Sequence, residues 1–381
     1  MKAQFFSSIH LIEAGVWNDL CGTDYPFLRH EFFAAMEDSG STTRETGWQA
    51  HHLGLSEGGE MLAVIPLFLK SHSYGEYVFD WSWAEAWHRY GHEYYPKLIN
   101  AIPFTPSYGP RWGFSNKLDE NQQQRLIQNC FEAIEEESKR LGLSSAHFLF
   151  HRAQDNTVFT EGNYLQRIGC QYHWLNRDYG DFEDFLSEFT SRKRKSLKRE
   201  RRLIAEQDLS LSICEGRAIT EEMWQQFYQF YQLTYLKRSG HGGYLNIDCF
   251  QRMAETLPEH MMMVQAQHRD DTVAAALFFK DKQTLYGRYW GCKQEFDQLH
   301  FETCYYQGIE YAIKAGLKRF DPGAQGEHKI QRGFTPIITY SHHRIQEPAF
   351  ANAIEKFLIA ETQQIKEHQK LACERLPFKE D

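Results

Sequence analysis

The chain has 381 residues, of which 42% are hydrophobic and 24% are charged, and its formal net charge is −9 at pH 7. This length exceeds what one hydrophobic core usually organises, and the composition excludes a fibrous or disordered chain. No apolar run approaches the roughly 18 residues of a membrane-spanning helix, so no integral membrane segment is expected.

The first 15 residues contain no apolar stretch typical of a signal peptide, and the eight cysteines are scattered without a Cys-x-x-Cys pair. Both features favour a cytoplasmic, reducing location. His88 and His92, like His147 and His151, are four residues apart, but two ligands do not make a metal site. We therefore expect no bound metal.

In chain order, the first half predicts helices within 25–40, an antiparallel meander over 49–81, a helix over 119–143 and a strand over 144–151. The second half predicts the same sequence of elements. Its segments are helices over 220–240 and 247–258, a meander over 260–292, a helix over 300–317 and a strand over 318–324. A final helix over 349–372 is expected to pack back on either half.

The two meanders are similar in sequence, which predicts an internal duplication. Each has two strands around a polar turn, and the second strand ends in a lysine, Lys70 or Lys280. A third strand then opens on Tyr-Gly, at residue 74 or 286. The chain is therefore predicted to be of the α+β class, with domains at 1–180 and 181–345 and a C-terminal helix at 346–381.

The loop predicted at 321–334 has the densest set of polar side chains, on a glycine-rich segment after a strand. Acyl transfer to an amine needs a base, donors for the oxyanion and a proton for the leaving group. Asp321 or Glu327 is a candidate base, His328 a proton shuttle, and Lys329 with Arg332 a partner for phosphate or oxyanion. A solvated loop is the alternative.

Residues 71–87 combine aromatic and acidic side chains. If 74–80 form a strand, Tyr74, Glu76 and Asp80 share one face. With Lys70 and Trp81 they would suit a sugar or peptide acceptor, and equally a packed sheet with polar edges. Tyr286, Arg288 and Trp290 repeat this layout in the second half.

Residues 191–202 hold eight basic side chains and one acid, Glu200, in an otherwise acidic chain. Crowded like charges on one helix repel each other, and a polyanionic partner would relieve that repulsion. The candidate phosphate-binding residues are Arg192, Arg194, Lys195, Lys198 and Arg201. A solvated amphipathic helix is the alternative.

The chain resembles the FemAB-like group within the GNAT superfamily of acyltransferases. The resemblance rests on residues 69–81, 103–111, 191–202, 286–292 and 299–334. It implies two tandem GNAT-like domains, each with a mixed, mostly antiparallel sheet flanked by helices. It also implies transfer of an acyl or aminoacyl group to an amine of a cell-wall precursor or small molecule. The sequence shows no Ser-His-Asp or Cys-His arrangement, which favours direct attack over a covalent intermediate.

The resemblance implies aminoacyl-tRNA or acyl-CoA as the co-substrate, with no tightly bound cofactor. Acyl-CoA enzymes usually bind pyrophosphate with a glycine-rich loop at a helix start. Here residues 292–299 contain no glycine. Lys329 in HKIQRGF matches the Phe-Lys-x-x-Phe-Gly-like stretch of Fem proteins with altered spacing. Two alternatives stay open, a non-catalytic protein that binds a nucleic acid or cell-wall precursor, and an acyl-CoA-dependent N-acetyltransferase.

Overall fold

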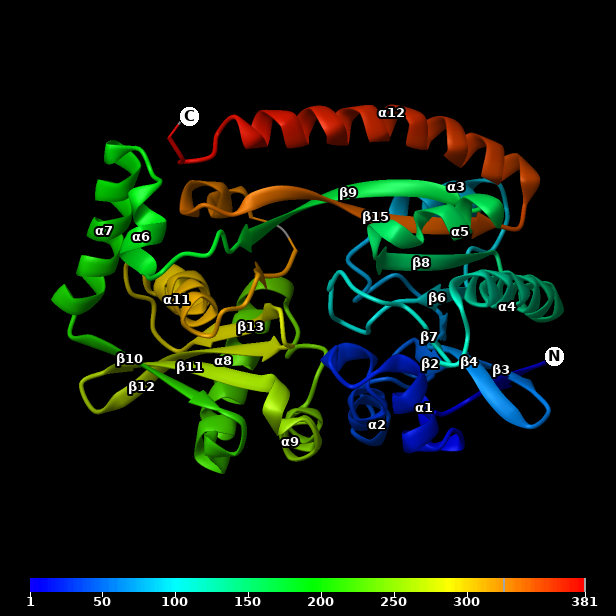
Figure 1. Cartoon of the computed structure of the whole chain (residues 1–381), viewed down its shortest axis with the longest axis horizontal. Coiled ribbons are helices and arrows are strands. Elements are labelled where there is room, and N and C mark those ends of the chain that lie inside the picture. The colour runs from blue at the N-terminus through cyan, green and yellow to red at the C-terminus, as the bar shows by residue number, and fades with distance from the viewer. Residues whose placement is uncertain (325, 380–381) are drawn as a thin grey trace. The chain divides into compact units, whose positions relative to one another are not determined.

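The computed structural model describes residues 1–324 and 326–379 and divides into two compact units (Figure 1). The first unit contains Met1–Cys170 and Ile338–Glu367, and the second contains Gln171–Ile337 and the residues from His368 onward. The chain changes unit within β9 (Leu165–Leu175), within β15 (Thr335–Ile345) and within the C-terminal helix α12 (Pro348–Cys373).

A small antiparallel sheet of order β1-β3-β4-β7 opens the first unit. Its strands are β1 (Lys2–Phe6), β3 (His52–Glu57), β4 (Glu60–Ile65) and β7 (Gly113–Phe114). The β3–β4 turn is Gly58-Gly59, and both glycines have positive φ, which a tight hairpin turn needs. Helix α1 (Ala14–Cys21) packs against β4 and β7, and α2 (His30–Asp38) packs against α1.

A second sheet of the first unit has the order β2-β5-β6-β8-β15. Its other strands are β2 (Trp48–Ala50), β5 (Phe68–Lys70), β6 (Lys97–Asn100) and β8 (Ser145–His151). The pair β6–β8 is parallel, and helix α4 (Glu120–Leu141) connects its two strands. The pairs β2–β5, β5–β6 and β8–β15 are antiparallel. Helices α3 (Trp81–Arg89) and α5 (Asn156–Glu161) complete the unit.

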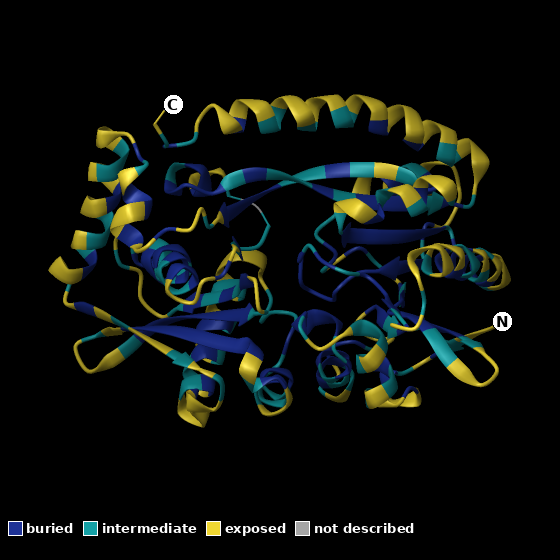
Figure 2. Ribbon diagram, in the orientation of Figure 1, coloured by how far each residue is buried: buried dark blue, intermediate teal, exposed yellow. Residues whose placement is uncertain are grey.

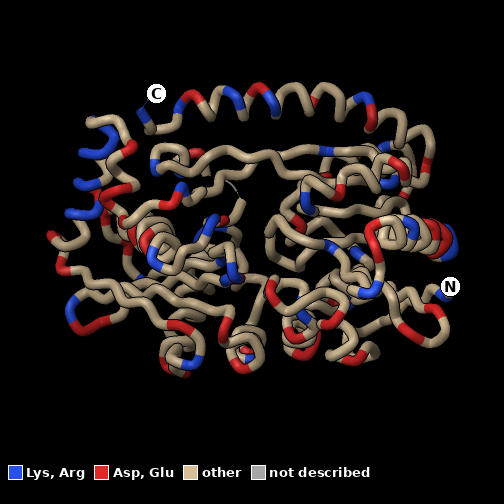
Figure 3. The backbone as a smooth tube through the Cα atoms, viewed as in Figure 1, with Lys and Arg blue, Asp and Glu red and all other residues tan. Residues whose placement is uncertain are grey.

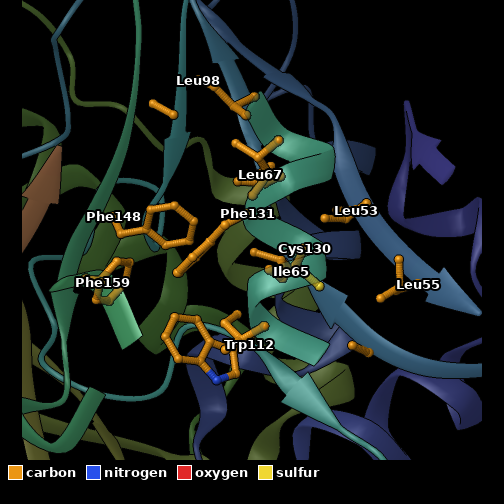
Figure 4. Packing of buried hydrophobic residues seen from close by; sticks show 14 of the residues in the cluster. Leu53, Leu55, Ile65, Leu67, Leu98, Trp112, Cys130, Phe131, Phe148 and Phe159 are labelled. Carbon is orange, nitrogen blue, oxygen red and sulfur yellow. The ribbon is translucent and has the colours of Figure 1, made fainter. Parts of the chain in front are cut away.

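The core of the first unit forms where α4 covers these strands (Figure 4). Phe131 of α4 points toward Phe148 of β8 and Phe159 of α5, with ring centres 5.5 and 5.3 Å away. A capping box between Asp119 and Gln122 fixes the start of α4, and Gly142 in a left-handed conformation ends it.

The sheet of the second unit has the order β10-β11-β12-β13-β14-β9. Its strands are β10 (Leu209–Glu215), β11 (Met261–His268), β12 (Asp271–Lys280), β13 (Thr284–Cys292) and β14 (Arg319–Asp321), together with the end of β9. Figure 2 shows that β11, β12 and much of β13 are buried. Helices α8 (Glu221–Ser239) and α9 (Ile247–Thr256) pack on each other, and α8 lies on β13.

The parallel pair β13–β14 is joined by a composite helix, made of α10 (Leu299–Phe301), a π-helical turn η6 (Glu302–Tyr306) and α11 (Gln307–Lys314). Helices α6 (Phe182–Ser187) and α7 (Ser191–Glu206) precede β10. The remaining short helices are η1 (Ile9–Leu11), η2 (Pro26–Leu28), η3 (Ala153–Asp155), η4 (Gly216–Ala218), η5 (Pro258–His260) and η7 (Glu327–Arg332).

The first unit completes its sheet with a strand segment from near the end of the chain, because residues 340–345 of β15 pair with β8. In the second unit, Trp174 and Leu175 of β9, near the start of its main segment, pair with β14. Neither unit is continuous in sequence, since residues 338–367 belong to the first unit and the residues from His368 onward belong to the second.

The two units repeat one connection pattern. In each, an antiparallel strand leads into a parallel pair with a helix between its strands: β5, β6, α4 and β8 in the first unit, and β12, β13, α10–α11 and β14 in the second. Lys70 ends β5 and Lys280 ends β12, so the two lysines hold equivalent positions. The fold is a pair of tandem units of the α+β class, with mixed, mostly antiparallel sheets flanked by helices, as predicted.

The predicted third strand over residues 74–80 is wrong, and with it the shared strand face of Tyr74, Glu76 and Asp80. The equivalent of β13 is β6, which begins at Lys97. Residues 71–80 form no strand, because Gly75 and Tyr77 have positive φ values of 80° and 62°, which extended backbone excludes. Residues 71–96 are instead an insertion between β5 and β6, whereas only residues 281–283 separate β12 from β13.

The helices predicted over 119–143, 191–202, 220–240, 247–258, 300–317 and 349–372 are confirmed as α4, α7, α8, α9, α10–α11 and α12. Within the described residues, no helix is long and apolar enough to span a membrane. The same part of the chain shows no group of three or more His, Cys, Asp and Glu residues that could hold a metal ion.

Candidate functional site

The loop predicted to carry the chemistry follows β14 in the second unit. Asp321 is the last residue of β14, and the loop continues into the short helix η7 (Glu327–Arg332) and then β15. Gly323, Gly326 and Gly333 have positive φ, so the glycines allow the sharp turns that bring the loop back toward Asp321. The structure describes the loop except for residue 325.

Asp321 is fully buried and accepts several hydrogen bonds. Its Oδ2 accepts from Arg288 Nη2 at 2.8 Å, and its Oδ1 accepts from the backbone N–H of Gly323 at 2.9 Å. His173 Nε2 lies 3.6 Å from Oδ1. Burial alone would raise the pKa of Asp321, but Arg288 and His173 hold that pKa well below its ordinary value. Asp321 is therefore an ionised anchor, which makes it a poor proton acceptor at neutral pH.

Arg288 reaches Asp321 because β13 bulges at this residue. The pairing of β12 with β13 shifts between Leu277↔Tyr289 and Phe278↔Gly287, which leaves Arg288 as the extra residue. A bulge re-aims the side chain that it carries. The simple alternation predicted for Tyr286, Arg288 and Trp290 is therefore wrong. Trp290 packs in a separate apolar cluster, whereas the Arg288 guanidinium lies 5.1 Å from the Tyr286 ring centre.

Lys329 lies in η7 with 2% of its surface exposed. Its ammonium donates to the carbonyl oxygen of Gly323 at 2.8 Å. Burial lowers the pKa of Lys329 to about 7, although the nearby Asp321 carboxylate opposes the shift. A lysine with this pKa is partly protonated at neutral pH, and such strongly shifted groups concentrate at functional sites.

His328, next to Lys329, lies at the surface of the unit. The Tyr305 hydroxyl lies 2.9 Å from His328 Nε2, within hydrogen-bond distance. Partial burial, together with the charges of Lys329 and Arg332, lowers the pKa of His328 to about 4. At neutral pH the imidazole is therefore uncharged, with a nitrogen available to take up a proton. The carboxylate of Glu327 is exposed and pairs with Arg375 at 2.8 Å.

Arg332 connects the loop to helix α7. Its Nη2 donates to Glu200 of α7 at 2.8 Å, its Nη1 donates to the carbonyl of His328, and its guanidinium stacks 3.4 Å from the Phe301 ring centre. With 6% of its surface exposed, Arg332 positions the loop. Glu200, the one acid in the basic segment, is thus a structural partner of this loop.

Side chains of the π-helical turn η6 contact both the loop and helix α7. A π-turn inserts one residue into a helix and is often found at functional sites. Here Tyr305 meets His328, Tyr306 donates to Glu200, and Glu302 binds Arg201. Residues far apart in the sequence, from α7, β13, η6 and the loop, therefore come together in the second unit.

The cations of α7 separate into two groups. Arg201 binds Glu302 and Glu310 at 2.9 and 2.8 Å, and Lys198 pairs with Glu183. Arg192, Lys195 and Arg199 are exposed, and no hydrogen bond or ion pair joins them to the described residues. Figure 3 shows that Lys and Arg residues are frequent along α7, which Figure 1 labels. The predicted phosphate-binding role therefore has its best support at Arg192 and Lys195, whereas Arg201 fixes α7 to the π-helical turn. Arg194 is half-buried.

A second buried charge cluster lies in the first unit, around Lys97 at the start of β6. Its ammonium donates to Glu76 at 2.8 Å, to Asp80 at 2.5 Å and to Ser73 at 2.9 Å. The Tyr94 hydroxyl also donates to Asp80 at 2.6 Å. Burial raises the pKa of Glu76 to about 7, and the positive charge of Lys97 opposes that shift.

Lys70 borders this cluster. Its ammonium lies 3.8 Å from the Trp48 ring centre and donates to the carbonyl of Tyr74 at 3.2 Å. Burial lowers the pKa of Lys70 to about 6. Tyr74 and Trp81 lie outside the cluster, with 57% and 40% of their surfaces exposed. Lys70, Glu76 and Asp80 are therefore internal, and only the aromatic members of this predicted set face solvent.

The structure brings the predicted residues Asp321, His328, Lys329, Arg288 and Arg332 together. Trp290 lies at the border of this group, because its ring contacts His300, which contacts His328. The structure adds residues that the sequence did not single out, namely His173, Tyr305 and Glu200 in the second unit and Lys97 in the first. Lys97 had a weak signal in the sequence, as a cation at the start of the apolar run KLINAI. Whether the predicted side chains bind substrate or act in catalysis stays a prediction.

This fold, with two units of one connection pattern and a polar loop after a parallel strand pair, is shared with FemX. The chain belongs to the FemAB-like family, described as peptidoglycan biosynthesis/recognition, whose model matches residues 8–380. None of the curated proteins compared with the chain matches it in sequence.

Solved structures agree in fold at low sequence identity. The crystal structure of FemX is 12% identical with a TM-score of 0.51, covering 93% of this chain and 100% of that one. The C-terminal domain of a putative lysylphosphatidylglycerol synthetase from Agrobacterium fabrum is 11% identical with a TM-score of 0.53, covering 91% and 96%. L-PGS from Bacillus licheniformis is 12% identical with a TM-score of 0.51, covering 85% and 94%.

Proposed function

We propose that this protein transfers an acyl or aminoacyl group to an amine of a peptidoglycan precursor, and that the transfer site lies in the second unit around Lys329. The family supports the class of reaction and the cell-wall acceptor. The observation that supports the site is the buried Lys329 ammonium, with its lowered pKa, beside the Asp321–Arg288 ion pair.

In such a transfer the acceptor amine attacks the donor carbonyl, and negative charge develops on the carbonyl oxygen. A positive charge fixed in a dry site stabilises that oxyanion far better than the same charge does in water. Protonated Lys329 would supply this charge. The Asp321 carboxylate favours the protonated form of Lys329. Hydrogen bonds from the Arg288 guanidinium and the Gly323 N–H keep Asp321 ionised and fixed in place.

The attacking amine must lose a proton, and the leaving group must gain one. His328 is neutral at physiological pH, so its ring can accept the amine proton and pass it to the departing oxygen or sulfur. The Tyr305 hydroxyl holds the imidazole in one orientation. No side-chain nucleophile is needed in this scheme, which matches the direct attack predicted from the sequence.

The donor in this proposal carries phosphate, as both aminoacyl-tRNA and acyl-CoA do. The exposed cations Arg192, Lys195 and Arg199 on α7 support a phosphate-bearing ligand, because they have no partner among the described residues. They do not distinguish the two donors.

The test incubates the purified chain with a UDP-linked muramyl-pentapeptide acceptor and, in separate reactions, acetyl-CoA or a mixture of aminoacyl-tRNAs. Mass spectrometry of the acceptor detects a transferred group. Lys329→Ala is expected to reduce transfer at least a hundredfold. The matched control Lys318→Ala removes an exposed lysine of the same unit and should leave transfer unchanged.

Equal rates in the two alanine variants would refute the assignment of Lys329. Binding of the acceptor without transfer from either donor would instead support the non-catalytic alternative, a protein that recognises the precursor.

A further inference from the structure

Two aromatic side chains stand together on the surface of the first unit. The rings of Tyr74 and Trp81 meet edge to face with their centres 4.9 Å apart, although 57% and 40% of the two residues are exposed. The His72 ring lies 5.3 Å from the Tyr74 ring, and its two ring nitrogens are hydrogen-bonded to the backbone of Thr46 and of Tyr74. Single exposed aromatic residues are common, but exposed rings held in contact with each other indicate a binding surface.

These residues belong to the insertion at 71–96, between β5 and β6. The equivalent connection in the second unit, between β12 and β13, has only residues 281–283. The insertion adds no strand to either sheet of its unit, and it contains helix α3. Segments added to a repeated fold in this way commonly carry specificity rather than stability.

Three buried side chains of the insertion fix it to Lys97 of β6. Ser73, Glu76 and Asp80 are buried and all bind the Lys97 ammonium, while Tyr74 and Trp81, each next to one of these anchors, face outward. Asp80 is also the N-cap residue of α3, so Trp81 is the first residue of that helix. The backbone of both aromatic residues is therefore fixed before any ligand arrives, which lowers the entropy lost on binding.

We propose that Tyr74 and Trp81 form a binding surface for a sugar ring of the peptidoglycan precursor. The less polar face of a pyranose presents C–H bonds that pack against aromatic rings, while its hydroxyl and acetamido groups can bond the Tyr74 hydroxyl. Two rings are too small a surface for a stable protein interface, which buries about 1,200–2,000 Å² in total. The choice of a cell-wall sugar rests on the proposed function.

The experiment measures binding of chitotriose, a soluble trimer of N-acetylglucosamine, to the full chain by isothermal titration calorimetry. Trp81→Ala and Tyr74→Ala are each expected to weaken binding at least tenfold, whereas Trp81→Phe should keep most of the affinity. Phe357→Ala, which removes another exposed aromatic residue of the first unit, is the matched control and should bind like the wild type. Equal melting temperatures would show that the variants are folded.

The inference is overturned if wild-type protein does not bind millimolar chitotriose, or if Trp81→Ala and Tyr74→Ala bind as tightly as Phe357→Ala. It is also overturned if the two rings are needed for binding to phosphatidylglycerol vesicles but not to the sugar. Lys329→Ala should bind chitotriose normally, because the two sites lie in different units. Sugar binding that depends on Trp81, in a protein without transferase activity, would support the inference and refute the proposed function.

Discussion

The guanidinium of Arg288 and the carboxylate of Asp321 form a buried ion pair, with Nη2 2.8 Å from Oδ2 and 2% and 1% of the two side chains exposed. The pair joins the bulge of β13 to the last residue of β14, where the parallel pairing of these strands ends. It therefore fixes the start of the loop that carries His328 and Lys329.

Arg288→Met should destabilise the protein by about 3–5 kcal/mol, because it leaves the Asp321 charge buried without its main partner. The double variant Arg288→Met/Asp321→Leu should recover much of that loss, since it removes both charges. Urea denaturation at pH 7 measures the free energies of unfolding, with Lys318→Ala as the exposed control. An Arg288→Met variant as stable as the control would show that the pair has no structural role.

The rate of transfer should depend on pH through two groups. His328 acts as a base only when neutral, above its pKa of about 4, and Lys329 stabilises the oxyanion only when protonated, below its pKa of about 7. The value of kcat/KM, which reports the groups of the free enzyme, should therefore rise through about pH 4 and fall through about pH 7. Lys329→Arg should remove the fall on the alkaline side, because arginine stays charged there. An alkaline fall that persists in Lys329→Arg would assign it to another group.

The buried cluster of the first unit makes a prediction about stability. Lys97→Met removes the shared partner of Glu76 and Asp80, so we expect it to cost about 3–5 kcal/mol of folding free energy. Lys117→Ala breaks an exposed pair with Glu60 and should leave the stability nearly unchanged. Chemical denaturation of both variants provides the comparison. Similar losses in the two variants would show that the cluster contributes little.

Glu76 adds a pH dependence to the stability. Burial raises its pKa to about 7, so between its ordinary value of 4.5 and about 7 the folded protein binds more protons than the unfolded chain. Glu76 should therefore make the protein less stable as the pH rises through this range. The measurement is the free energy of unfolding of wild type and Glu76→Gln from pH 4.5 to 7. Over this range it should fall less with rising pH in Glu76→Gln than in wild type, because glutamine does not titrate. Parallel curves for the two proteins would contradict this prediction.

The sequence predicted most helices because their signals are local. Helix α4 has Asp119 and Gln122 at its start, Gly142 after its end, and apolar residues such as Ile127 and Phe131 at helical spacing between them. The loop at 321–334 was predicted for a similar reason, because its polar residues and glycines are contiguous in the chain.

The parts that were missed depend on contacts between distant residues. The Tyr-Gly pair at 74–75 matches the start of β13 in sequence, but Glu76 and Asp80 bind Lys97, 21 and 17 residues further on, and the segment folds around that ammonium. Nothing local marks Lys97 as the partner. The pairings of β9 with β14 and of β15 with β8 join residues more than 140 positions apart, so hydrophobic periodicity could not reveal these pairings.

The exposed cations Arg192, Lys195 and Arg199 of α7 give the last prediction. They lie three and four residues apart, so they follow one face of the helix, and no described side chain neutralises them. If they bind phosphates of a tRNA-like donor, each contact should steepen the fall of affinity by ~0.7 to 0.9 log units per tenfold rise in salt. The variant Arg192→Glu/Lys195→Glu/Arg199→Glu should bind bulk tRNA more weakly, with a flatter salt dependence.

The control variant Arg89→Glu/Lys117→Glu/Lys139→Glu makes the same change in net charge at exposed positions of the first unit. Filter-binding titrations at several salt concentrations compare both variants with wild type. Because Arg201 and Glu200 keep their partners in the α7 variant, its folding should be unchanged. If the slopes of the two variants are equal, net charge alone controls binding. If wild type does not bind tRNA, the phosphate-bearing donor is not tRNA-like, and the same variants should then be compared in acyl-CoA binding.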